Sequence, residues 1–139
     1  FRRVLFRSKY TFAGWYTDSK LTKAWDFNTK IKSGKTLYAK WKKISLKQAV
    51  ISKVQNVSGK KIKVTVKKVS GADGYQIQYS TKSNMKSAKT VTSSKTTTTI
   101  SKLSKGKKYY VRVKAYKKDS TGKKVAGKWS KVKNFKVSK

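Results

Sequence analysis

The sequence contains no cysteine, histidine, glutamate or proline. The missing cysteines exclude a disulfide framework and a zinc ribbon. The four carboxylates, Asp18, Asp26, Asp73 and Asp119, lie beside turns or strand ends in different parts of the chain. Aspartate in such places ordinarily bonds nearby backbone amides. Because no two acids are close in sequence and no nucleophile, phosphate-loop or metal motif occurs, we expect no enzyme activity, no metal and no cofactor.

Long apolar runs are also missing. No stretch of about 18 apolar residues occurs, so no membrane span is predicted, and the first residues lack the apolar core of a signal peptide. What the chain has instead is cationic charge, with 38 Lys+Arg against 4 Asp+Glu. Such a surface repels itself and attracts polyanions in a salt-dependent way. A length of 139 residues permits one ordinary domain or two small ones.

The first eight residues have a composition of their own. Arg2, Arg3 and Arg7 lie there, whereas every lysine falls after residue 8. The segment FRRVLFRS is similar to a translated sequencing-library adapter, so we expect residues 1–8 to be a non-native artefact at the cut end of a metagenomic fragment. A basic N-terminal arm is the alternative.

Residues 9–43 are rich in aromatic side chains, which predicts a core. Strands are expected around Tyr10 and Phe12 and over residues 37–41, after a turn at 33–35. The segments YTFAGWYTD, WDFNT and TLYAKW are similar to the C-terminal half of the internalin-type B repeat (Flg_new), a β-grasp-like module of bacterial surface proteins. The resemblance implies that the first strands of the repeat are missing. A piece of this size should depend on its neighbour for folding.

The longer part, residues 44–139, has turn signals about every 8 to 12 residues, which is typical of a sandwich of seven strands. In the stretch from Leu103 to Tyr116, alternation predicts a strand with one buried face, preceded by a turn at Gly106. The expected strands are 49–57, 61–67, 74–80, 88–94, 96–101, 109–116 and 129–137. The side chains expected inside two of them are Tyr75, Ile77, Tyr79, Tyr109, Val111, Val113 and Ala115.

The spacing of Leu103, Gly106 and Tyr109 resembles the tyrosine corner of fibronectin type III domains. The resemblance implies that the Tyr109 hydroxyl bonds backbone near Leu103. Val66 stands where that family usually carries a buried tryptophan, and we expect Trp129 to fill part of the volume. In the last strand Trp129 and Val132 are expected inside but are out of phase with Phe135 and Val137, which predicts a bulge or a change of sheet face.

Outward positions on these strands carry lysine, which covers apolar surface and discourages strand-to-strand aggregation. Attraction to polyanions is the alternative, and with few arginines it should be diffuse and salt-sensitive. The candidate ligand-facing residues are Tyr110, Arg112, Lys114, Tyr116, Lys131 and Lys133. Trp15, Trp25 and Trp41 are candidate stacking rings for sugars, although core positions are the simpler interpretation.

The predicted fold is therefore all-β, with a truncated β-grasp-like B-repeat fragment at 9–43 and an immunoglobulin-like (fibronectin type III) sandwich at 44–139. The two resemblances imply a structural spacer or adhesion module of a secreted or cell-surface bacterial protein, and a Gram-positive cell is the expected source. Expected partners are neighbouring domains of the same parent protein. The alternative function is binding of teichoic acid, glycosaminoglycan or host glycan. No specific nucleic-acid partner is expected, because no RNA- or DNA-binding motif occurs.

Overall fold

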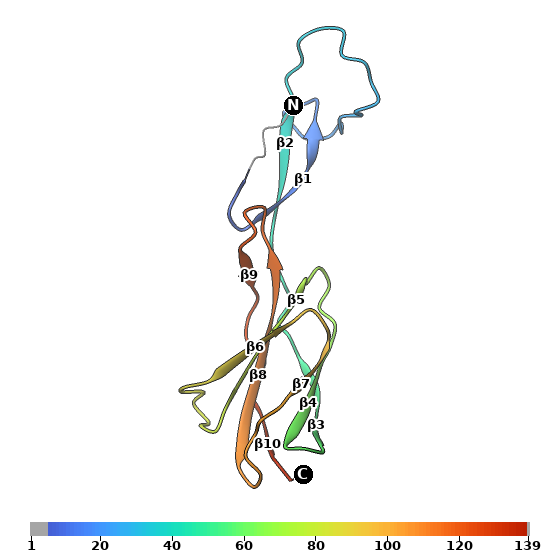
Figure 1. The fold of residues 1–139 in the computed structure, drawn as a ribbon. Coiled ribbons are helices and arrows are strands. Elements are labelled where there is room, and N and C mark those ends of the chain that lie inside the picture. The colour runs from blue at the N-terminus through green and yellow to red at the C-terminus, as the bar shows by residue number, and fades with distance from the viewer. Residues whose placement is uncertain (1–5, 139) are drawn as a thin grey trace. The chain divides into compact units, whose positions relative to one another are not determined.

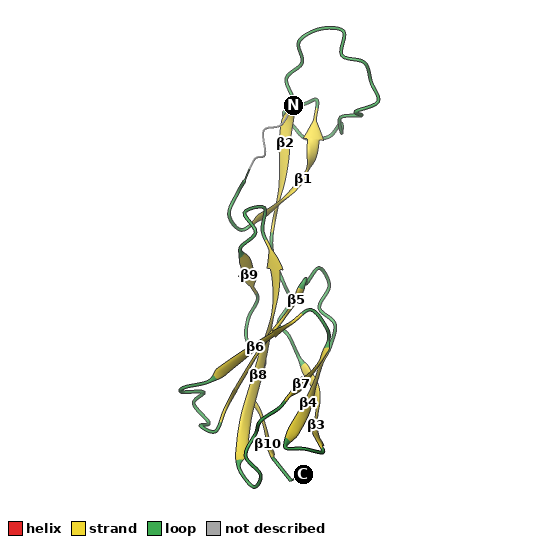
Figure 2. Cartoon of the chain, in the orientation of Figure 1, coloured by secondary structure: helices red, strands yellow, loops and turns green. Residues whose placement is uncertain are grey.

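The computed structural model describes residues 6–138, and this part of the chain consists of strands and loops without a helix (Figure 2). Two compact units are present. Unit 1 comprises residues 1–44 with 118–123, and unit 2 comprises residues 45–117 with 124–139. Residues 1–5, which belong to the predicted artefact, lie outside the described residues.

Unit 1 is built on a two-stranded antiparallel sheet of β1 (Tyr10–Tyr16) and β2 (Tyr38–Lys43). The register shifts between Phe12 and Gly14, where the glycine has a φ of 118°. The ring of Phe12 packs edge-on against Trp15 and Trp41, with centroid distances of 5.4 and 5.6 Å. These aromatic side chains form a small, half-exposed cluster. Among the described residues of unit 1 no apolar side chain is buried, so the prediction of an aromatic core is not confirmed.

Residues 118–123 complete unit 1 from far along the chain. The Lys9 amide donates to the Asp119 carboxylate at 2.8 Å, and the Ser120 amide donates to the Tyr10 carbonyl at 2.9 Å. Asp119 is buried and also accepts bonds from the Thr121 hydroxyl and amide and from the Lys123 amide. A carboxylate with several donors is favoured in its charged form. The Thr121 hydroxyl, followed by the Lys9 amide, lowers the pKa of Asp119 to about 2.

Unit 2 is a sandwich of two antiparallel sheets (Figure 1). The smaller sheet has the order β3-β4-β7, with strands Ile51–Val57, Lys61–Val66 and Thr97–Ile100. The larger has the order β10-β8-β5-β6, with strands Lys133–Lys136, Lys108–Lys118, Gly74–Ser80 and Lys89–Ser93, and β9 (Lys124–Ala126) also pairs with β8.

The core lies between these sheets and follows the predicted alternation. Ile62 and Val64 of β4 face Ile77 of β5 and Val111 and Val113 of β8, and all five are fully buried. The opposite side of each strand is polar, so period-2 patterning selects one inward face per strand. Tyr75 is buried as well, and its hydroxyl accepts a bond from the Val69 amide at 2.9 Å.

The start of β8 has the geometry of a tyrosine corner. The Ser104 amide donates to the Tyr109 hydroxyl at 3.0 Å, beside the buried side chain of Leu103. Gly106 has a φ of 80°, a left-handed turn conformation that suits glycine. The Tyr109 ring stacks on Phe135 of β10 at 5.9 Å, so the phenol ties the corner to the last strand. The Tyr109 hydroxyl thus bonds backbone next to Leu103, as expected.

The final strand departs from the prediction because it is divided. β9 and β10 both pair with β8 but are separated by residues 127–132. Between them the Val113 amide donates to the Ser130 side-chain hydroxyl at 2.9 Å. In a regular ladder the acceptor would be a backbone carbonyl, so the side-chain bond interrupts the strand pairing. The predicted irregularity is confirmed, while unit 2 has eight strands instead of seven.

Trp129 does not fill core volume next to Val66, and that prediction is wrong. Val66 is buried in a cluster that includes Ile51 and Val69. Trp129 is half-buried and lies against Arg112 and Lys114. Both cations project from the outward side of β8, so the indole covers the outer face of the larger sheet. Val132, also expected inside, is exposed.

Replacing Tyr109 with phenylalanine should destabilise unit 2 by about 1 kcal/mol, because the Ser104 amide loses its acceptor while the ring keeps its packing. Urea unfolding followed by NMR amide signals of β5 and β8 measures this loss. Y110F is the matched control, since that hydroxyl lies on the outward side of β8 and should be nearly neutral. An equal effect of the two substitutions would contradict the role of the corner.

The Asp119 carboxylate should make unit 1 sensitive to acid. Its pKa is lowered from 3.8 to about 2, so its stabilising contribution is present above about pH 4 and is lost as the pH falls toward 2. The Lys9 amide signal, followed by NMR, should titrate with a midpoint of about 2. The transition should be absent in D119N and retained in D18N; a Lys9 signal that titrates unchanged in D119N would rule the interaction out.

Candidate ligand-facing surface

The outward face of β8 brings together four of the predicted ligand-facing residues. Tyr110, Arg112, Lys114 and Tyr116 alternate along the strand with the buried inward positions. Arg112 lies opposite Gln78 of β5, and its Nε and Nη2 both donate to Gln78 Oε1, at 2.9 and 2.8 Å. The guanidinium is therefore bound to a side chain of β5, so its planar donor group is partly committed inside the protein.

Trp129 covers the middle of this face. The Arg112 guanidinium carbon and the Lys114 ammonium nitrogen each lie 4.4 Å from the centroid of its ring. Arg112 and Lys114 are neighbours on the outward side of β8, and the indole packs over both of them. Cation–π attraction holds this stack together. The ring is half-buried in these contacts, which leaves less of its surface for stacking on a sugar or a base.

Tyr110 and Tyr116 differ in their exposure. Tyr110 is half-buried, with the Lys108 ammonium 5.6 Å from its ring centroid. Tyr116 is buried, and its hydroxyl oxygen would lie 2.6 Å from a Cβ atom placed on Gly74. Only glycine leaves room for this phenol. Tyr116 therefore packs against β5, contrary to its selection as an exposed candidate.

Lys131 and Lys133 do not join this face. Lys133 pairs with the inward residue Val111, so it projects from the other side of the larger sheet. Both lysines line a separate hollow with Gln48 and Ile51, near the start of β3. The predicted set of six thus divides between two places on unit 2.

The tryptophans of unit 1 do not form a flat stacking platform. Trp15 and Trp41 pack against Phe12 at steep angles, and Trp25 meets Phe27 edge-on with the Lys35 ammonium 5.7 Å from its centroid. Among the described residues, the ring pair that stacks face to face is Tyr109 with Phe135, which belongs to the sandwich core. These rings give a sugar-stacking role no geometric support.

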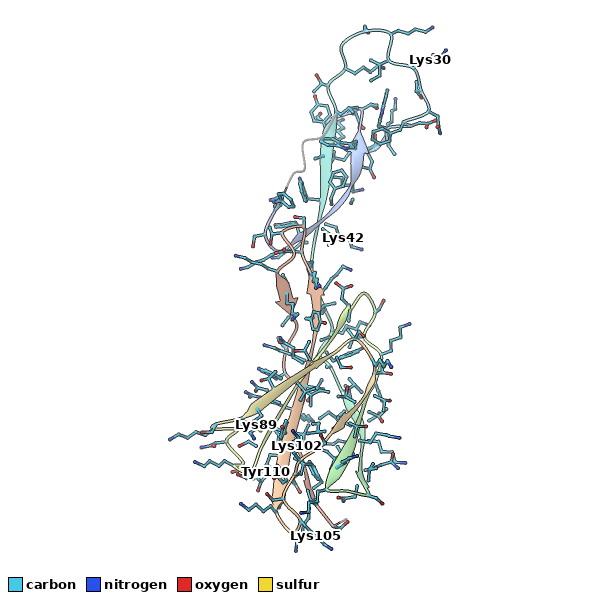
Figure 3. The ribbon with its side chains drawn as sticks, viewed as in Figure 1. Lys30, Lys42, Lys89, Lys102, Lys105 and Tyr110 are labelled. Atoms are coloured by element: carbon cyan, nitrogen blue, oxygen red, sulfur yellow. The ribbon has the colours of Figure 1, made fainter. Side chains whose placement is uncertain are left out.

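Lysine side chains project from the backbone along both units (Figure 3). Lys61, Lys63 and Lys67 are exposed on or just after β4, as the alternation predicts, whereas Lys114 is half-buried beside Trp129. The stems of such side chains cover apolar surface while the ammonium groups stay in water.

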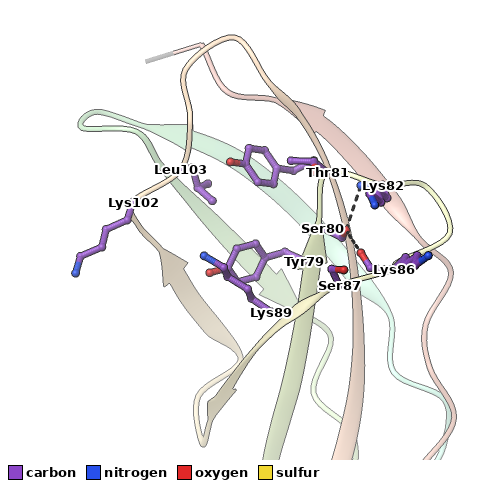
Figure 4. A pocket seen from close by; sticks show the side chains of 10 residues that line it. Tyr79, Ser80, Thr81, Lys82, Lys86, Ser87, Lys89, Lys102 and Leu103 are labelled. Carbon is purple, nitrogen blue, oxygen red and sulfur yellow. Dashed lines mark hydrogen bonds between the residues drawn. The ribbon is translucent and has the colours of Figure 1, made fainter.

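A hollow of about 180 Å³ beside β5 is a feature that sequence reasoning did not find (Figure 4). Tyr79, Leu103 and Tyr109 contribute to its lining. Its lysines come from three separate segments, the loop after β5, the start of β6 and the residues before β8. They are Lys82, Lys86, Lys89 and Lys102. No local sequence pattern joins these segments, so only the sheet register brings the lysines together.

The four carboxylates lie apart and serve as local anchors. Asp18 accepts bonds from Thr22 and Lys23, and the Thr22 hydroxyl is the main cause that lowers the pKa of this carboxyl. Asp26 accepts a bond from the Asn28 amide, and Asp73 lies 3.6 Å from the Lys117 ammonium. Within residues 6–138, no group of three or more potential metal ligands is found.

The family comparison agrees with this architecture. A model of the fibronectin type III domain matches residues 51–128, which is more than half of the chain and lies largely within unit 2. The chain belongs to the fibronectin type III family. A second model, that of the Listeria-Bacteroides repeat domain (Flg_new), matches residues 3–40, a range that includes residues 3–8 of the segment set aside as an artefact.

Solved type III domains share the fold. The chain resembles the FN1–FN3 domains of chicken CNTN1 with a TM-score of 0.56 and 21% identity, over 75% of this chain and 35% of that one. It resembles the sixth type III domain of human fibronectin type III domain containing protein 3 with a TM-score of 0.55 and 19% identity, over 70% of this chain and 90% of that one. At these identities the likeness concerns the fold alone.

A curated relative matches a short segment. The "Putative Gly-rich membrane protein" of Evansella cellulosilytica is 61% identical over 33 residues, which are 23% of this chain and 4% of the relative. The chain thus spans a small part of that protein's length.

The two matched domain types are typically non-catalytic, extracellular-type modules, and a type III domain indicates a structural or adhesion-type role. Residues 6–138 contain no helix with the length and apolarity needed to cross a membrane.

Replacing Trp129 with leucine should cost unit 2 about 1 to 2 kcal/mol, because two cation–π contacts are lost together. The midpoint of urea unfolding, again followed by amide signals of β5 and β8, measures the change. V132A alters an exposed neighbour and should shift stability by less than about 0.5 kcal/mol. A W129L protein as stable as the parent would show that the stack contributes nothing.

Proposed function

We propose that the chain is a non-enzymatic spacer or adhesion module of a longer protein, displayed on or secreted from a Gram-positive bacterial cell, and that unit 2 carries tension along that protein. Its partners in this role are the neighbouring domains of the same parent protein. The extracellular type of both matched domains supports the location, as does the membrane-protein name of the Evansella relative.

The observation that carries the proposal is the way β3 and β10 lie together in unit 2. At one end, Gln48 Nε2 donates to the Trp129 carbonyl at 2.7 Å. At the other end, Asn56 Nδ2 donates to the Lys136 carbonyl at 2.9 Å, and the Ser138 amide donates to Asn56 Oδ1 at 3.1 Å. The first and last strands of the sandwich therefore run parallel to each other, joined by side-chain amides although they belong to different sheets.

This arrangement places the entry and exit of the sandwich at opposite ends. The chain enters β3 at the end where Gln48 lies and leaves β10 at the end where Asn56 and Ser138 lie. Tension applied to the two ends pulls these strands past each other along their length. The amide bridges lie across that direction, so they must break together before the strands can slide. A domain that resists tension in this way is suited to act as a spacer.

The buried side chains of the same two strands add to this resistance. Ile51 of β3 is 2% exposed and Val137, just after β10, is fully buried, and both belong to the core cluster. Sliding one strand against the other must pull these side chains out of the core, at a cost of about 1.5 to 3 kcal/mol for each fully exposed side chain. The side-chain hydrogen bonds and the buried apolar contacts of these two strands therefore break in the same step.

Single-molecule force spectroscopy on the full chain, placed between marker domains of known unfolding force, tests the proposal. We expect unit 2 to unfold in one step with a measurable force peak. N56A should lower the peak force because it removes both bonds at the exit end. N134A, which truncates an exposed amide on β10, is the matched control and should leave the peak unchanged.

Two outcomes would overturn the proposed mechanical role. One is an absence of any force peak for unit 2 in the unmodified chain. The other is a peak that N56A and N134A lower equally, which would show that the bridges at the exit end carry no load.

A further inference from the structure

The hollow beside β5 is a concave site whose walls come from three parts of unit 2. Tyr79, at the end of β5, and the buried Leu103 and Tyr109 supply aromatic and aliphatic surface. Figure 4 shows Lys82 and Lys86 on the loop after β5, Lys89 on the returning strand, and Lys102 on the segment that leads into Leu103. The hollow thus combines an apolar wall with a cationic rim.

Within residues 6–138, no ion pair balances the positive charge at this rim. All four carboxylates of the chain are engaged elsewhere: Asp18 with Thr22, Asp26 with Asn28, Asp73 with Lys117, and Asp119 with Lys9 and Thr121. The four lysines line the hollow from different sides, and a concave surface of one sign concentrates ions of the other. An anion in the hollow would therefore be attracted by all of these walls.

The loop that carries two of these lysines is fixed by its own bonds. The Ser80 hydroxyl donates to the Lys86 carbonyl at 2.8 Å and accepts from the Lys82 amide at 3.1 Å, and Ser80 itself is buried. Ser87 and Lys102 have φ values of 54° and 59°, which non-glycine residues seldom adopt. A wall held in this way needs little ordering when a ligand binds.

The chemistry of the lining favours one kind of anion. Lysine acts as a point charge with three donors, which suits the oxygens of a sulfate or phosphate ester without requiring a planar partner. The half-buried Tyr79 ring offers a surface for the carbon side of a sugar or polyol. At about 180 Å³ the hollow is smaller than the pockets of drug-sized ligands, and it fits an ester group with part of the residue that bears it.

A nucleic-acid base fits this site less well. Base recognition in single strands uses aromatic faces on which the base can stack. Tyr79 and Tyr109 pack against each other with centroids 6.4 Å apart and a 50° tilt, so no slot lies between them. Phe135 stacks on the Tyr109 ring and occupies the ring face that it covers.

We propose that this hollow is a binding site for a sulfate or phosphate ester carried on a sugar or polyol chain, which makes unit 2 a receptor for an anionic glycan in addition to a spacer. The ester occupies the lysine rim and the sugar lies against Tyr79. This site is local, in contrast to diffuse attraction by the whole lysine surface.

NMR titration of the full chain at about 0.15 M salt tests the site, with a sulfated heparin tetrasaccharide in one arm and a short poly(glycerol phosphate) in the other. We expect the largest amide shifts at residues 80–89 and 102–103 with at least one probe. K82Q/K89Q should weaken binding more than tenfold, since each close charge contributes about fivefold in water. K53Q/K63Q removes the same charge from the other sheet and should weaken binding less than threefold, because screening limits distant charges.

The outcomes separate the possibilities. Shifts confined to the hollow with the sulfated probe alone, the phosphorylated probe alone, or both support the site and identify the ester. Equal losses in the two double variants, shifts spread over the whole surface, or no binding of either probe would overturn it. A single-stranded oligonucleotide of equal charge that binds as tightly, with the same shifts, would also overturn the glycan assignment. Because β3 and β10 are untouched by K82Q/K89Q, the unfolding force stays the same whichever result is obtained.

Discussion

The bond between the Ser104 amide and the Tyr109 hydroxyl holds the point at which the chain crosses from the smaller sheet to the larger one. Leu103 enters the core on one side of this crossing, and the Tyr109 ring enters it five residues after the bonded serine. With both side chains fixed, only one of the two alternating sets of residues in β8 can face the core. Every second residue from Tyr109 to Ala115 then faces inward, and β5 and β10 take their registers from this strand.

That single phase also decides what the outer surface carries. If Val111 and Val113 are inside, Arg112 and Lys114 must be outside, where Trp129 packs over both. The protein thereby uses part of its large cationic excess for packing, since an indole that contacts two cations covers their apolar stems and attracts their charges at once. Most other lysines remain in water, where their mutual repulsion opposes the compact state and is reduced by salt. The few carboxylates are too scarce to neutralise this charge, and they act as caps of individual turns.

The sequence predicted the strands of the sandwich well because their information is local. Alternation in KIKVTV and GYQIQYS, and the turn before Tyr109, depend on neighbours a few residues apart. The errors arose where the deciding partner is distant. Trp129 and Val132 were assigned inward from their own spacing, but the Ser130 hydroxyl takes a ladder bond from Val113 and resets the phase of the segment. Asp119 lies in a turn, as predicted. Its bond to the Lys9 amide joins residues that are 110 positions apart, and no local sequence pattern indicates such a contact.

The candidate site shows the same limit. Arg112 and Lys114 are predicted on one face because they share a strand. Lys133 is grouped with them as an outward residue of the last strand, but it pairs with the inward Val111 and lies on the other side of the sheet. The lysines of the hollow come from three segments, in a chain where lysine is common everywhere, so no sequence signal distinguishes them. Their grouping follows from the β5–β6 turn meeting the segment before Leu103.

The two proposed roles, resistance to tension and ligand binding, both involve the Tyr109 ring. The ring contributes to the lining of the hollow, and it stacks on Phe135 of β10, the last strand of the sandwich. While the bridges between β3 and β10 hold, Phe135 supports the wall of the hollow. Once β10 is pulled away, Tyr109 loses its stacking partner, and the Gly106 amide loses the Val137 carbonyl that anchors the turn before β8. Under the two proposals, a glycan that requires the formed hollow would therefore be released when β10 separates from β3, and the same strand pair would set both the unfolding force and the range of force over which the ligand stays bound.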